Sequence, residues 1–436
     1  MKVAMIIEAD GKKVTCPSAA AQMAYFEKLL IENGIEKAEN PEDMDYLIYS
    51  SCGFDGKTLE RVCDKIKAFT MLQGFNGTHY KLMIVGCLAK MLKDVGKYNE
   101  DVIVVDDPVW SKAAIDIILN REKNILPKDI LESKTKTYWY GNEVLIAVNI
   151  VDGCINKCSF CKHNYMGSNL SSIPYNDLLN FLKNKIKNGT KVIDFHGDCL
   201  NLYGIDLEGK PILHKLLHEL SKEKDLAFMS LAEVTAQNMY PELLEEIKNN
   251  PKIRRVTLQL ESASNEVLKN MNRCHTIEKY DDIATTIQNG GKFIDTVLMS
   301  GFPKETYKDL DDTISYLKKR GIPALQICQY VDSNLLPSHK FEQYSYKEKV
   351  EHTKYLREKL KDINLQIYRK NIWRMSNSVI YGKKDNKVFM VGGMPKFAYS
   401  DSLKHVNLEL GSVIEEAPKT YIKSARVAKR KSIYKY

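Results

Sequence analysis

Short runs of β-forming residues alternate with helical patterns along most of this chain, and that alternation is the strongest constraint on its fold. Strands and helices in regular succession are typical of a parallel sheet covered by helices. The sequence therefore predicts an α/β protein. The runs predicted to be buried strands are residues 3–7, 46–50, 82–85, 102–105, 145–150, 192–196, 227–231, 255–260, 296–300 and 324–329.

The chain is long enough for about three domains at roughly 150 residues each. Residues 1–127 are expected to form an amino-terminal parallel α/β domain, and residues 144–368 a partial (β/α)6 barrel of the TIM type. A polar segment at 128–142 separates the two. Residues 369–436 are expected to form a small β domain. Its short β-like patches lie at 388–391 and 406–410.

The composition, with 44% hydrophobic and 28% charged residues, is that of a folded soluble protein. The longest apolar stretches fall short of the ~18 residues of a membrane span, and the amino terminus lacks the apolar core of a signal peptide. We therefore expect a cytoplasmic protein without a membrane segment. Much of the net charge of +8 lies in a basic carboxy-terminal tail, which suits a phosphate backbone and equally a solvated terminus.

A loop with the pattern CxxxCxxC follows the predicted strand 145–150 and contains Cys154, Cys158 and Cys161. In TIM-type barrels the active site lies at the carboxyl ends of the strands, where this loop is expected. Three thiolates can hold three irons of a 4Fe-4S cluster and leave the fourth iron open to a small molecule. The alternative is a Cys3His zinc site that includes His163.

A second set of cysteines is predicted in the amino-terminal domain. Cys52 and Cys87 each follow a predicted strand, and Cys16 precedes a predicted helix at residues 19–32. Because the carboxyl ends of parallel strands share one edge of a sheet, we expect these loops to converge on a second cluster. In a reducing compartment the remaining cysteines are expected to be small buried hydrophobic residues. They are Cys63, Cys199, Cys274 and Cys328.

With both cysteine sets in view, most of the chain before the last domain resembles the radical S-adenosylmethionine methylthiotransferases. The amino-terminal motifs are Tyr49-Ser-Ser-Cys52-Gly and Ile84-Val-Gly-Cys87-Leu-Ala-Lys90. The barrel motifs are His196-Gly-Asp-Cys-Leu-Asn-Leu-Tyr-Gly204, the run from Glu261 to Arg273, and Gly301-Phe-Pro-Lys-Glu305. The order and spacing of these motifs together are specific for the family.

The resemblance implies two 4Fe-4S clusters and S-adenosylmethionine as cofactors. One S-adenosylmethionine would methylate sulfur held on the auxiliary cluster, and a second, cleaved at the barrel cluster, would supply the radical that attacks an unactivated C–H bond. The implied ligands are Cys154, Cys158 and Cys161 for the barrel cluster, and Cys16, Cys52 and Cys87 for the auxiliary cluster.

Four polar or small residues near strand ends are expected to contact S-adenosylmethionine. Gly197 and Asp198 would meet its ammonium group, and Glu261 and Ser262 its ribose hydroxyls. Capping or turn roles are the alternative for each of them. Tyr140, in the polar segment, is expected to pack rather than to bind the cofactor.

The segment Tyr203 to Pro211 is closer to the family branch that modifies a ribosomal-protein aspartate than to the tRNA-adenosine branch. The family's carboxy-terminal TRAM docking domain is only faintly suggested. The sequence also departs from the family at Ala19, Ser171, Ser172 and the stretch Glu233 to Ala236. We therefore expect a protein or peptide side chain as substrate, with tRNA as the alternative, and a low-potential electron donor such as flavodoxin or ferredoxin.

Two hypotheses from other classes stay open. The first is a non-enzymatic iron-sulfur or zinc protein that binds RNA through its basic tail, which 5'-deoxyadenosine formation would exclude. The second is a two-cluster radical enzyme with a different outcome, such as thioether crosslinking of a peptide, which product analysis would distinguish.

Overall fold

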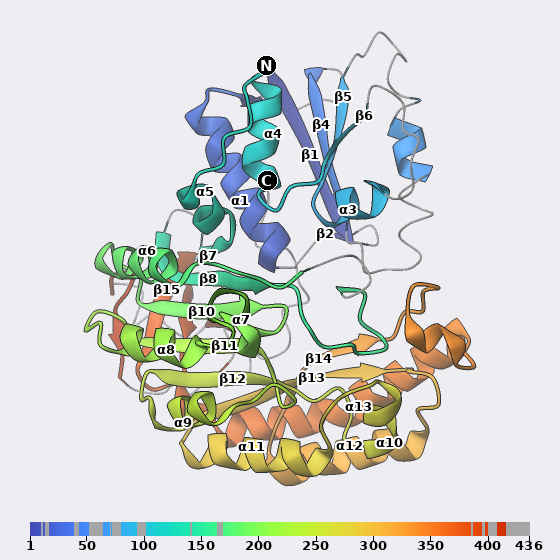
Figure 1. Ribbon diagram of the computed structural model, residues 1–436. Coiled ribbons are helices and arrows are strands. Elements are labelled where there is room, and N and C mark those ends of the chain that lie inside the picture. Colours follow the sequence, from blue (N-terminus) through green and yellow to red (C-terminus); the bar gives the residue numbers. More distant parts are fainter. Residues whose placement is uncertain are drawn as a thin grey trace. The chain divides into compact units, whose positions relative to one another are not determined.

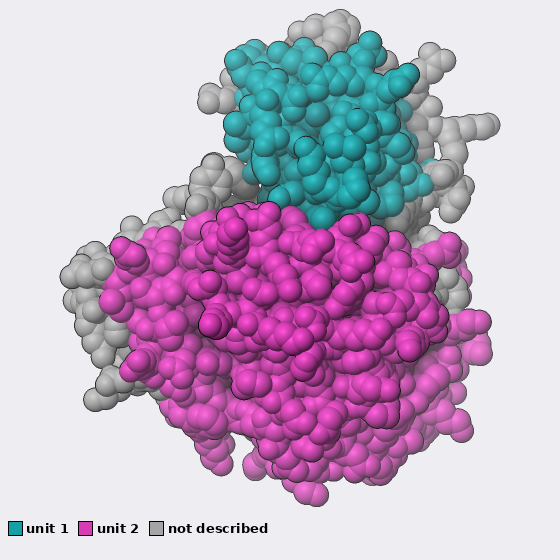
Figure 2. Space-filling view, turned by 60° about the vertical axis from the view of Figure 1, so that its left-hand side comes forward, with its two compact units in different colours: residues 1–136 teal, residues 137–436 magenta. Residues whose placement is uncertain are grey.

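A computed structural model of the chain describes residues 1–9, 12–13, 17–38, 43–51, 64–69, 71, 80–93, 102–139, 142–163, 169–384, 387–394, 397–399 and 408–415. The chain forms two compact units, Met1–Lys136 and Thr137–Tyr436 (Figure 2). Each unit contains its own parallel sheet with helices beside it (Figure 1). The predicted α/β class is therefore confirmed, whereas the three predicted domain boundaries stay a prediction.

In the described part of unit 1, the sheet has the strand order β2-β1-β4-β5-β6, and β3 also pairs with β1. Strands β1, β4, β5 and β6 are parallel and contain the four runs predicted for this region. Their carboxyl ends therefore lie along one edge of the sheet. The strand bounds are β1 Lys2–Ala9, β2 Lys12–Lys13, β3 Glu36–Lys37, β4 Tyr46–Ser51, β5 Lys81–Val85 and β6 Val102–Val105.

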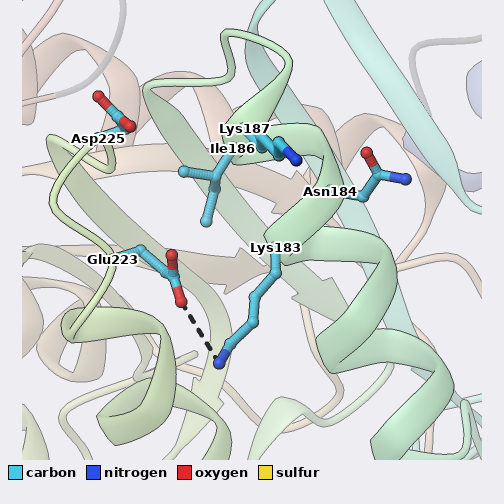
Figure 3. Close-up of a pocket in the computed structure, with 6 residues that line it drawn as sticks. All are labelled: Lys183, Asn184, Ile186, Lys187, Glu223 and Asp225. Atoms are coloured by element: carbon cyan, nitrogen blue, oxygen red, sulfur yellow. Dashed lines mark ion pairs between the residues drawn. The ribbon is translucent and has the colours of Figure 1, made fainter.

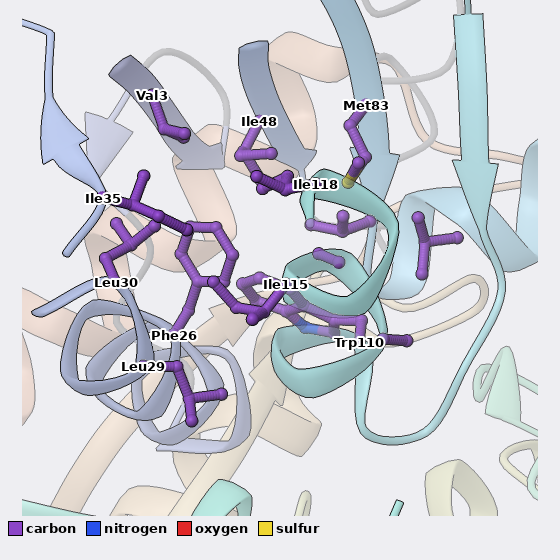
Figure 4. Packing of buried hydrophobic residues seen from close by; sticks show 14 of the residues in the cluster. Val3, Phe26, Leu29, Leu30, Ile35, Ile48, Met83, Trp110, Ile115 and Ile118 are labelled. Carbon is purple, nitrogen blue, oxygen red and sulfur yellow. The ribbon is translucent and has the colours of Figure 1, made fainter. Parts of the chain in front are cut away.

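One hydrophobic cluster of unit 1 lies between a face of this sheet and helices α1 and α4 (Figure 4), and a second cluster includes residues of the sheet and of α3. The rings of Phe26 on α1 and Trp110 on α4 lie 5.8 Å apart between centroids, and Ile48 and Met83 of the sheet are buried beside them. Burial of each such side chain stabilises the fold by roughly 1.5–3 kcal/mol. The helices are α1 Pro17–Glu32, α3 Cys87–Lys93, α4 Trp110–Ile118 and α5 Pro127–Ser133.

Unit 2 contains the partial barrel that the sequence predicts. Its described strands β8, β10, β11, β12, β13 and β14 are all parallel to their neighbours and follow one another across a curled sheet. Helices connect successive strands on the outside of this sheet (Figure 1). The strand bounds are β8 Asn142–Asp152, β10 Val192–Gly197, β11 Phe228–Thr235, β12 Ile253–Gln259, β13 Phe293–Ser300 and β14 Ala324–Gln329.

The helices of unit 2 begin and end where their sequence dictates. The Thr306 hydroxyl accepts the N–H of Asp309 at the start of α12, the Asp309 carboxylate accepts the N–H of Thr306, and Gly321 at φ +67° ends the helix. The helix bounds are α6 Tyr175–Lys187, α7 Ile205–Glu208, α8 Leu213–Ser221, α9 Pro241–Asn249, α10 Asn265–Asn270, α11 Ile277–Asn289, α12 Tyr307–Arg320 and α13 Tyr346–Lys370. Short 3-10 turns are η4 Leu200–Leu202, η5 Pro337–Lys340 and η6 Ile372–Met375.

The two units meet within the polar segment at 128–142, between Lys136 and Thr137, but the described part of this segment is not a loop. It contains α5 and a strand, β7 (Thr135–Trp139), which pairs with β8 at one end of the barrel sheet. The hydroxyl of Tyr138 is hydrogen-bonded to Asp194 on β10. Pairing with β8 and this long-range hydrogen bond make a strand of a segment whose own composition favours a loop.

A network of buried polar side chains joins β12 and β13. The buried Arg255 Nε donates to Asp295 Oδ2 at 2.7 Å, and the hydroxyl of Thr257 donates to Asp295 Oδ1 at 2.6 Å. Because each buried charge here has a partner, this network avoids the large cost of an isolated ion.

A small antiparallel sheet follows the barrel, as predicted, with the described strand order β17-β16-β15-β18. Val379 and Val391 pack against Val192 and Phe228, which lie at the amino-terminal ends of barrel strands. The predicted β patch at 406–410 is wrong in its described part, because residues 408–410 form a bend and turn stabilised by the bond from Gly411 N–H to the Ile380 carbonyl. Strand bounds are β9 Ser171–Ser172, β15 Ser378–Lys384, β16 Lys387–Val391, β17 Phe397–Tyr399 and β18 Val413–Ile414.

Among the described helices, each is too short or too polar to cross a membrane.

Candidate iron-sulfur site

The predicted cysteine loop begins at the carboxyl end of β8, which ends at Asp152. The chain turns at Gly153, whose φ of +77° lies in the left-handed region. A Cβ atom at this position would lie 2.4 Å from the carbonyl oxygen of Asn169. Only glycine fits there without moving the backbone, so the residue before Cys154 is fixed by the fold.

The middle of the loop is held by the carboxyl end of α10. The N–H of Ser159 donates to the Met271 carbonyl at 2.9 Å, and its hydroxyl donates to the Asn270 carbonyl at 2.8 Å. The Asn272 side chain donates to the Lys157 carbonyl at 2.6 Å. The last residues of the motif that extends from Glu261 to Arg273 therefore orient the cysteine loop. This contact explains why the two motifs occur together.

Asp198, at the end of β10, holds both ends of the loop. Its Oδ2 accepts the N–H of Gly153 at 2.7 Å and lies 3.1 Å from His163 Nδ1. The residue predicted to meet the cofactor's ammonium group thus already has protein partners. Its contact with S-adenosylmethionine stays a prediction.

Polar groups surround the three thiols. The N–H of Asn156 donates to Cys154 Sγ at 3.4 Å. The N–H of His163 is hydrogen-bonded to the Cys161 thiol. The Gln237 side chain, whose Oε1 accepts the N–H of Cys274 at 3.3 Å, lies beside Cys158. Hydrogen bonds to cysteine sulfur are among the features that set the reduction potential of a bound iron-sulfur cluster.

The pKa values of the free thiols differ within this small loop. A hydrogen bond from Cys199 lowers the pKa of Cys154 to about 7. Burial raises the pKa of Cys158, and burial raises the pKa of Cys161 to about 12. Metal binding requires the thiolate form, which these surroundings favour at Cys154 and disfavour at Cys158 and Cys161.

The three cysteines fit a 4Fe-4S cluster. The charges of Cys154 and Cys158 raise the pKa of Cys161, and the charge of Cys154 raises the pKa of Cys158, so the three thiols lie near one another. Three convergent thiols, with backbone and amide donors around them, are the donor set of a cube with one open iron. Within the described ranges, no three His, Cys, Asp or Glu side chains are grouped closely enough for a single metal ion.

The other predicted cofactor residues lie at strand ends near the loop. A Cβ atom at Gly197 would lie 2.5 Å from Val151 Cγ1, so glycine allows β10 to approach β8. Glu261 has φ +67° and forms a buried ion pair with Arg273. Ser262 is buried and its hydroxyl accepts the N–H of Ser264 at 3.2 Å. Binding of S-adenosylmethionine by these residues stays a prediction.

Sequence reasoning missed the residues that surround the cysteines from other loops. Arg273 is the last residue of a family motif, and the motif alone does not indicate its place: its guanidinium lies 5.3 Å from the Phe160 ring centroid and its charge acts on Cys158. Gln237 and Asn238 follow β11, just after the stretch that departs from the family pattern. The departure of residues 233–236 from the family pattern was the sequence feature that could have drawn attention to Gln237 and Asn238.

The expectation that the remaining cysteines are small buried hydrophobic residues holds only in part. Cys199 is buried but has polar partners, Cys328 is half-buried, and Cys274 is exposed because it lies in the connection between α10 and α11. Cys63 lies outside the described residues.

Of the predicted auxiliary ligands, Cys87 is described. It is exposed and is the first residue of α3, directly after β5 and Gly86. Cys16, Cys52 and Tyr140 lie outside the described residues. The described elements next to Cys16 and Cys52 are the start of α1 and the carboxyl end of β4, which is the neighbour of β5.

A surface hollow of about 450 Å³ lies between the end of α6 and the loop before β11, where Lys183 and Glu223 form an ion pair at 3.3 Å (Figure 3). Helix α6 ends just before β10 begins, so this hollow lies at the amino-terminal edge of the barrel sheet. The cysteine loop lies at the opposite edge, so the hollow is not part of the candidate site.

Known families match both units. The model of the radical SAM superfamily matches residues 148–317, and that of the uncharacterized protein family UPF0004 matches residues 11–105. The radical S-adenosylmethionine methyltransferase TsrM of Kitasatospora setae has a related fold, with a TM-score of 0.50 and 10% identity over 78% of this chain and 74% of that chain.

Curated relatives are similar over most of the chain. The ribosomal protein uS12 methylthiotransferase RimO of Carboxydothermus hydrogenoformans is 28% identical over 315 residues, 70% of each chain. The tRNA-2-methylthio-N(6)-dimethylallyladenosine synthase of Thermotoga petrophila is 26% identical over 372 residues, 83% of each chain.

The match across the barrel makes this chain a radical S-adenosylmethionine enzyme. The second match and the relatives that extend over both units are more specific. The chain belongs to the radical S-adenosylmethionine methylthiotransferase family, as its motifs implied, and uses S-adenosylmethionine and two 4Fe-4S clusters.

Proposed function

We propose that this enzyme inserts a methylthio group at an unactivated C–H bond of a protein or peptide side chain, with a ribosomal protein as the first candidate substrate. The observation that carries the proposal is the cysteine loop at the carboxyl edge of the barrel, where Cys154, Cys158 and Cys161 converge and Asp198 joins the two ends of the loop. When bound, the clusters and S-adenosylmethionine supply hydrogen abstraction and the methylthio group.

The chain's own residues would position the barrel cluster and exclude water from it. Cys158 is buried, and Arg273 and Glu261 beside it are buried as well. Such an enclosed setting protects a reactive radical from water and competing hydrogen donors. Gly197, Asp198, Glu261 and Ser262 remain our proposed contacts for S-adenosylmethionine.

A polar pair near the loop is a candidate contact for the substrate side chain. His196 Nδ1 lies 3.1 Å from Glu233 Oε2, at the carboxyl ends of the neighbouring strands β10 and β11. His196 is two residues from Asp194, so both lie on the inner face of the strand. Together they offer a donor and an acceptor to a side chain that enters the barrel.

The auxiliary cluster is proposed to bind Cys16, Cys52 and Cys87. Support comes from the sheet of unit 1, in which the carboxyl ends of β4 and β5 are neighbours. A 4Fe-4S cluster with one open iron needs three cysteine ligands, and loops at neighbouring strand ends can bring three cysteines together. A low-potential donor such as flavodoxin or ferredoxin is proposed to reduce the barrel cluster.

The ribosomal-protein candidate is favoured by the relatives named for uS12 methylthiotransfer. Transfer RNA is the second candidate, because the Thermotoga relative named for tRNA modification is similar over a larger share of the chain. Both substrates occur where ribosomes work, so we propose that the enzyme acts in the cytoplasm.

The test is incubation of the anaerobically reconstituted enzyme with S-adenosylmethionine, a reductant and either ribosomal protein uS12 or unmodified tRNA. A gain of about 46 Da on the protein, the mass of a methylthio group replacing hydrogen, is expected together with 5'-deoxyadenosine. A gain on tRNA alone would transfer the proposal to the second candidate. Reduction without 5'-deoxyadenosine would contradict both.

Two variants separate the clusters. Cys154→Ala is expected to abolish 5'-deoxyadenosine, because it removes a ligand of the radical-forming cluster. Cys87→Ala is expected to keep 5'-deoxyadenosine formation and lose the methylthio product. Loss of both products in Cys87→Ala, with the barrel cluster intact, would contradict the separate role of the auxiliary site.

A further inference from the structure

One side of the cysteine loop lies at the protein surface. Cys158 and Ser159 are buried, whereas Ile155 is 54% exposed and Lys157 is exposed as well. These two exposed residues directly adjoin Cys154 and Cys158 in the chain. The surface that they form is therefore close to the residues proposed to bind the barrel cluster.

Two neighbouring segments extend this surface. The N–H and the hydroxyl of Ser159 donate to carbonyls at the carboxyl end of α10, at 2.9 and 2.8 Å, and the Ser159 carbonyl accepts the hydroxyl of Ser338 on η5 at 2.7 Å. The last turn of α10 contains Lys269, and η5 ends at Lys340. Both lysines thus belong to segments that are held against the cysteine loop.

Lys340 shares one aromatic ring with another lysine, Lys304. The Lys304 Nζ atom lies 4.8 Å from the ring centroid of Phe341, and the Lys340 Nζ atom lies 5.6 Å from it. The two ammonium groups are therefore close together, and like charges at short range repel each other. A negatively charged partner bound over them would relieve this repulsion.

The charges of these lysines are not neutralised within the described part of the chain. The lysines are exposed and form no ion pair with a described carboxylate; they are Lys157, Lys269, Lys304 and Lys340. Glu266 and Glu342 are exposed on the same segments, so the surface keeps a positive balance. Such a surface attracts a negatively charged molecule from solution.

Two kinds of macromolecule carry such negative charge, namely a nucleic acid and an acidic redox protein. Proteins that bind single-stranded nucleic acid stack its bases on aromatic faces. At this surface the rings of Phe160 and Phe341 are half-buried, and each already lies against a cation, Arg273 or Lys304. These rings offer little room for a base, which favours the redox protein.

The position of the surface also suits electron transfer, which slows steeply as the distance between the redox centres grows. Phe341 and Phe160 pack against the same buried cluster around Phe302, and Phe160 directly precedes Cys161. A protein docked over Phe341 would therefore lie close to the barrel cluster. Complexes of electron-transfer proteins have small interfaces, and the exposed Ile155 gives this one an apolar contact.

We propose that Ile155 and the four lysines form the docking surface for an acidic electron-donor protein. The inference rests on the proposed function, because the donor would reduce a cluster on Cys154, Cys158 and Cys161. One electron would leave the reduced donor and enter the oxidised cluster, and no other group would be transferred. The lysines would attract the donor and hold it only transiently.

The test is the rate at which a reduced flavodoxin of net negative charge reduces the full-length, reconstituted enzyme, followed by stopped-flow absorbance of the cluster. In Lys269→Glu/Lys340→Glu we expect the second-order rate constant to fall about tenfold or more at low salt, because charge steering contributes about 10–10³-fold to association rates. The affinity for oxidised flavodoxin, measured by calorimetry, should weaken as well. Reduction by dithionite, which needs no docked protein, should proceed as in wild type.

The salt dependence gives a second readout. In wild type the rate with flavodoxin should fall as the ionic strength rises from about 0.01 M to about 0.15 M, because the Debye length shortens from about 30 Å to about 8 Å. The variant with two reversed charges should lose most of this dependence. A wild-type rate that does not respond to salt would contradict a charged docking surface.

Lys187→Glu/Lys224→Glu is the matched control, because it reverses two exposed lysines at the opposite, amino-terminal edge of the barrel sheet and should keep the wild-type rate. If Lys269→Glu/Lys340→Glu does not keep its iron, Lys304→Gln takes its place, with a smaller fall expected. A flavodoxin rate equal to that of wild type in the iron-loaded variant would overturn the inference alone.

A normal flavodoxin rate together with weaker binding of tRNA would assign the surface to RNA and would also overturn the inference. The proposed function is tested separately by wild type reduced with dithionite. If that protein forms no 5'-deoxyadenosine from S-adenosylmethionine, the proposed function fails, whatever the docking surface binds.

Discussion

His163 Nδ1 and Asp198 Oδ2 lie 3.1 Å apart, and the same carboxylate oxygen accepts the N–H of Gly153. Gly153 directly precedes the first cysteine of the loop, and His163 follows the last. The side chain directly after β10 therefore joins both ends of a loop that begins after β8. These contacts with the barrel help to define the shape of the loop.

Asp198→Ala is expected to loosen this loop and weaken iron binding. Loss of the groups that orient metal ligands typically lowers metal affinity roughly 10–100-fold. The measurement is the rate at which a chelator removes iron from the reconstituted protein, compared with wild type. Asp198→Asn, which keeps an oxygen for Gly153, should lose iron more slowly than Asp198→Ala. Equal rates in wild type and Asp198→Ala would refute the role given to this carboxylate.

Gly153→Ala is expected to abolish the barrel cluster without unfolding the protein. The new Cβ would meet the Asn169 backbone at 2.4 Å, and the loop would have to move. The iron content should fall by about half, since one of two four-iron clusters is lost, while circular dichroism stays that of wild type.

The control is Gly209→Ala. Gly209 also has a positive φ, of +70°, but its Cβ direction is open. The left-handed backbone conformation should destabilise this variant by roughly 1–2 kcal/mol. The variant should nevertheless keep all its iron. If both glycine variants keep full iron, the steric argument at Gly153 is wrong.

Arg273→Met is expected to destabilise unit 2 strongly. Glu261 is 7% exposed and would lose the partner of its buried charge. Removing one member of a buried pair costs about 3–5 kcal/mol, which urea unfolding under anaerobic conditions can measure. The exposed pair Lys308–Asp312 is the control, and Lys308→Met should change stability little. Similar small effects in both variants would contradict the importance of the buried pair.

The sequence was sufficient for the parts of the site that depend on local pattern. Cys154 was expected at the carboxyl end of a strand because the apolar run before it is continuous, and β8 ends two residues before it. Asp198 was assigned to the cofactor's ammonium group. Its protein partners are Gly153 and His163, which are 45 and 35 residues away, and only the parallel pairing of β8 with β10 brings them together.

Other parts of the fold depend on contacts that no local pattern contains. The strand β7 was missed because its polar residues acquire strand pairing only beside β8. The polar partners of Cys199 come from Thr235 and Asn238 on the next strand and its loop, so the residue resembled an ordinary buried thiol. The sequence was enough to predict that Cys199 is buried, but not which polar groups it contacts.

The stability of the protein is expected to fall on acidification because of His275. Burial lowers the pKa of His275 to about 4, from an ordinary value of 6.5, and the charges of Arg273 and Lys279 act in the same direction. The folded state therefore keeps this side chain neutral while the unfolded chain binds a proton. Stability present above pH 6.5 is lost as the pH falls from 6.5 towards 4.

His275→Phe, which keeps a ring beside Tyr280, should remove this contribution. Between about pH 7 and about pH 5.5 wild type should lose about 1 kcal/mol more of its free energy of unfolding than the variant. Urea unfolding at the two pH values measures the difference. An identical pH dependence in both proteins would show that His275 is not held neutral.

The most direct test of the whole account is an iron and sulfide count on anaerobically prepared protein, with each cysteine triplet replaced by alanine in turn. About eight irons in wild type are expected to fall to about four in the Cys154/Cys158/Cys161 variant, and to about four in the Cys16/Cys52/Cys87 variant. A wild-type protein with a single zinc ion, or a count that either triple replacement leaves unchanged, would contradict the two-cluster enzyme.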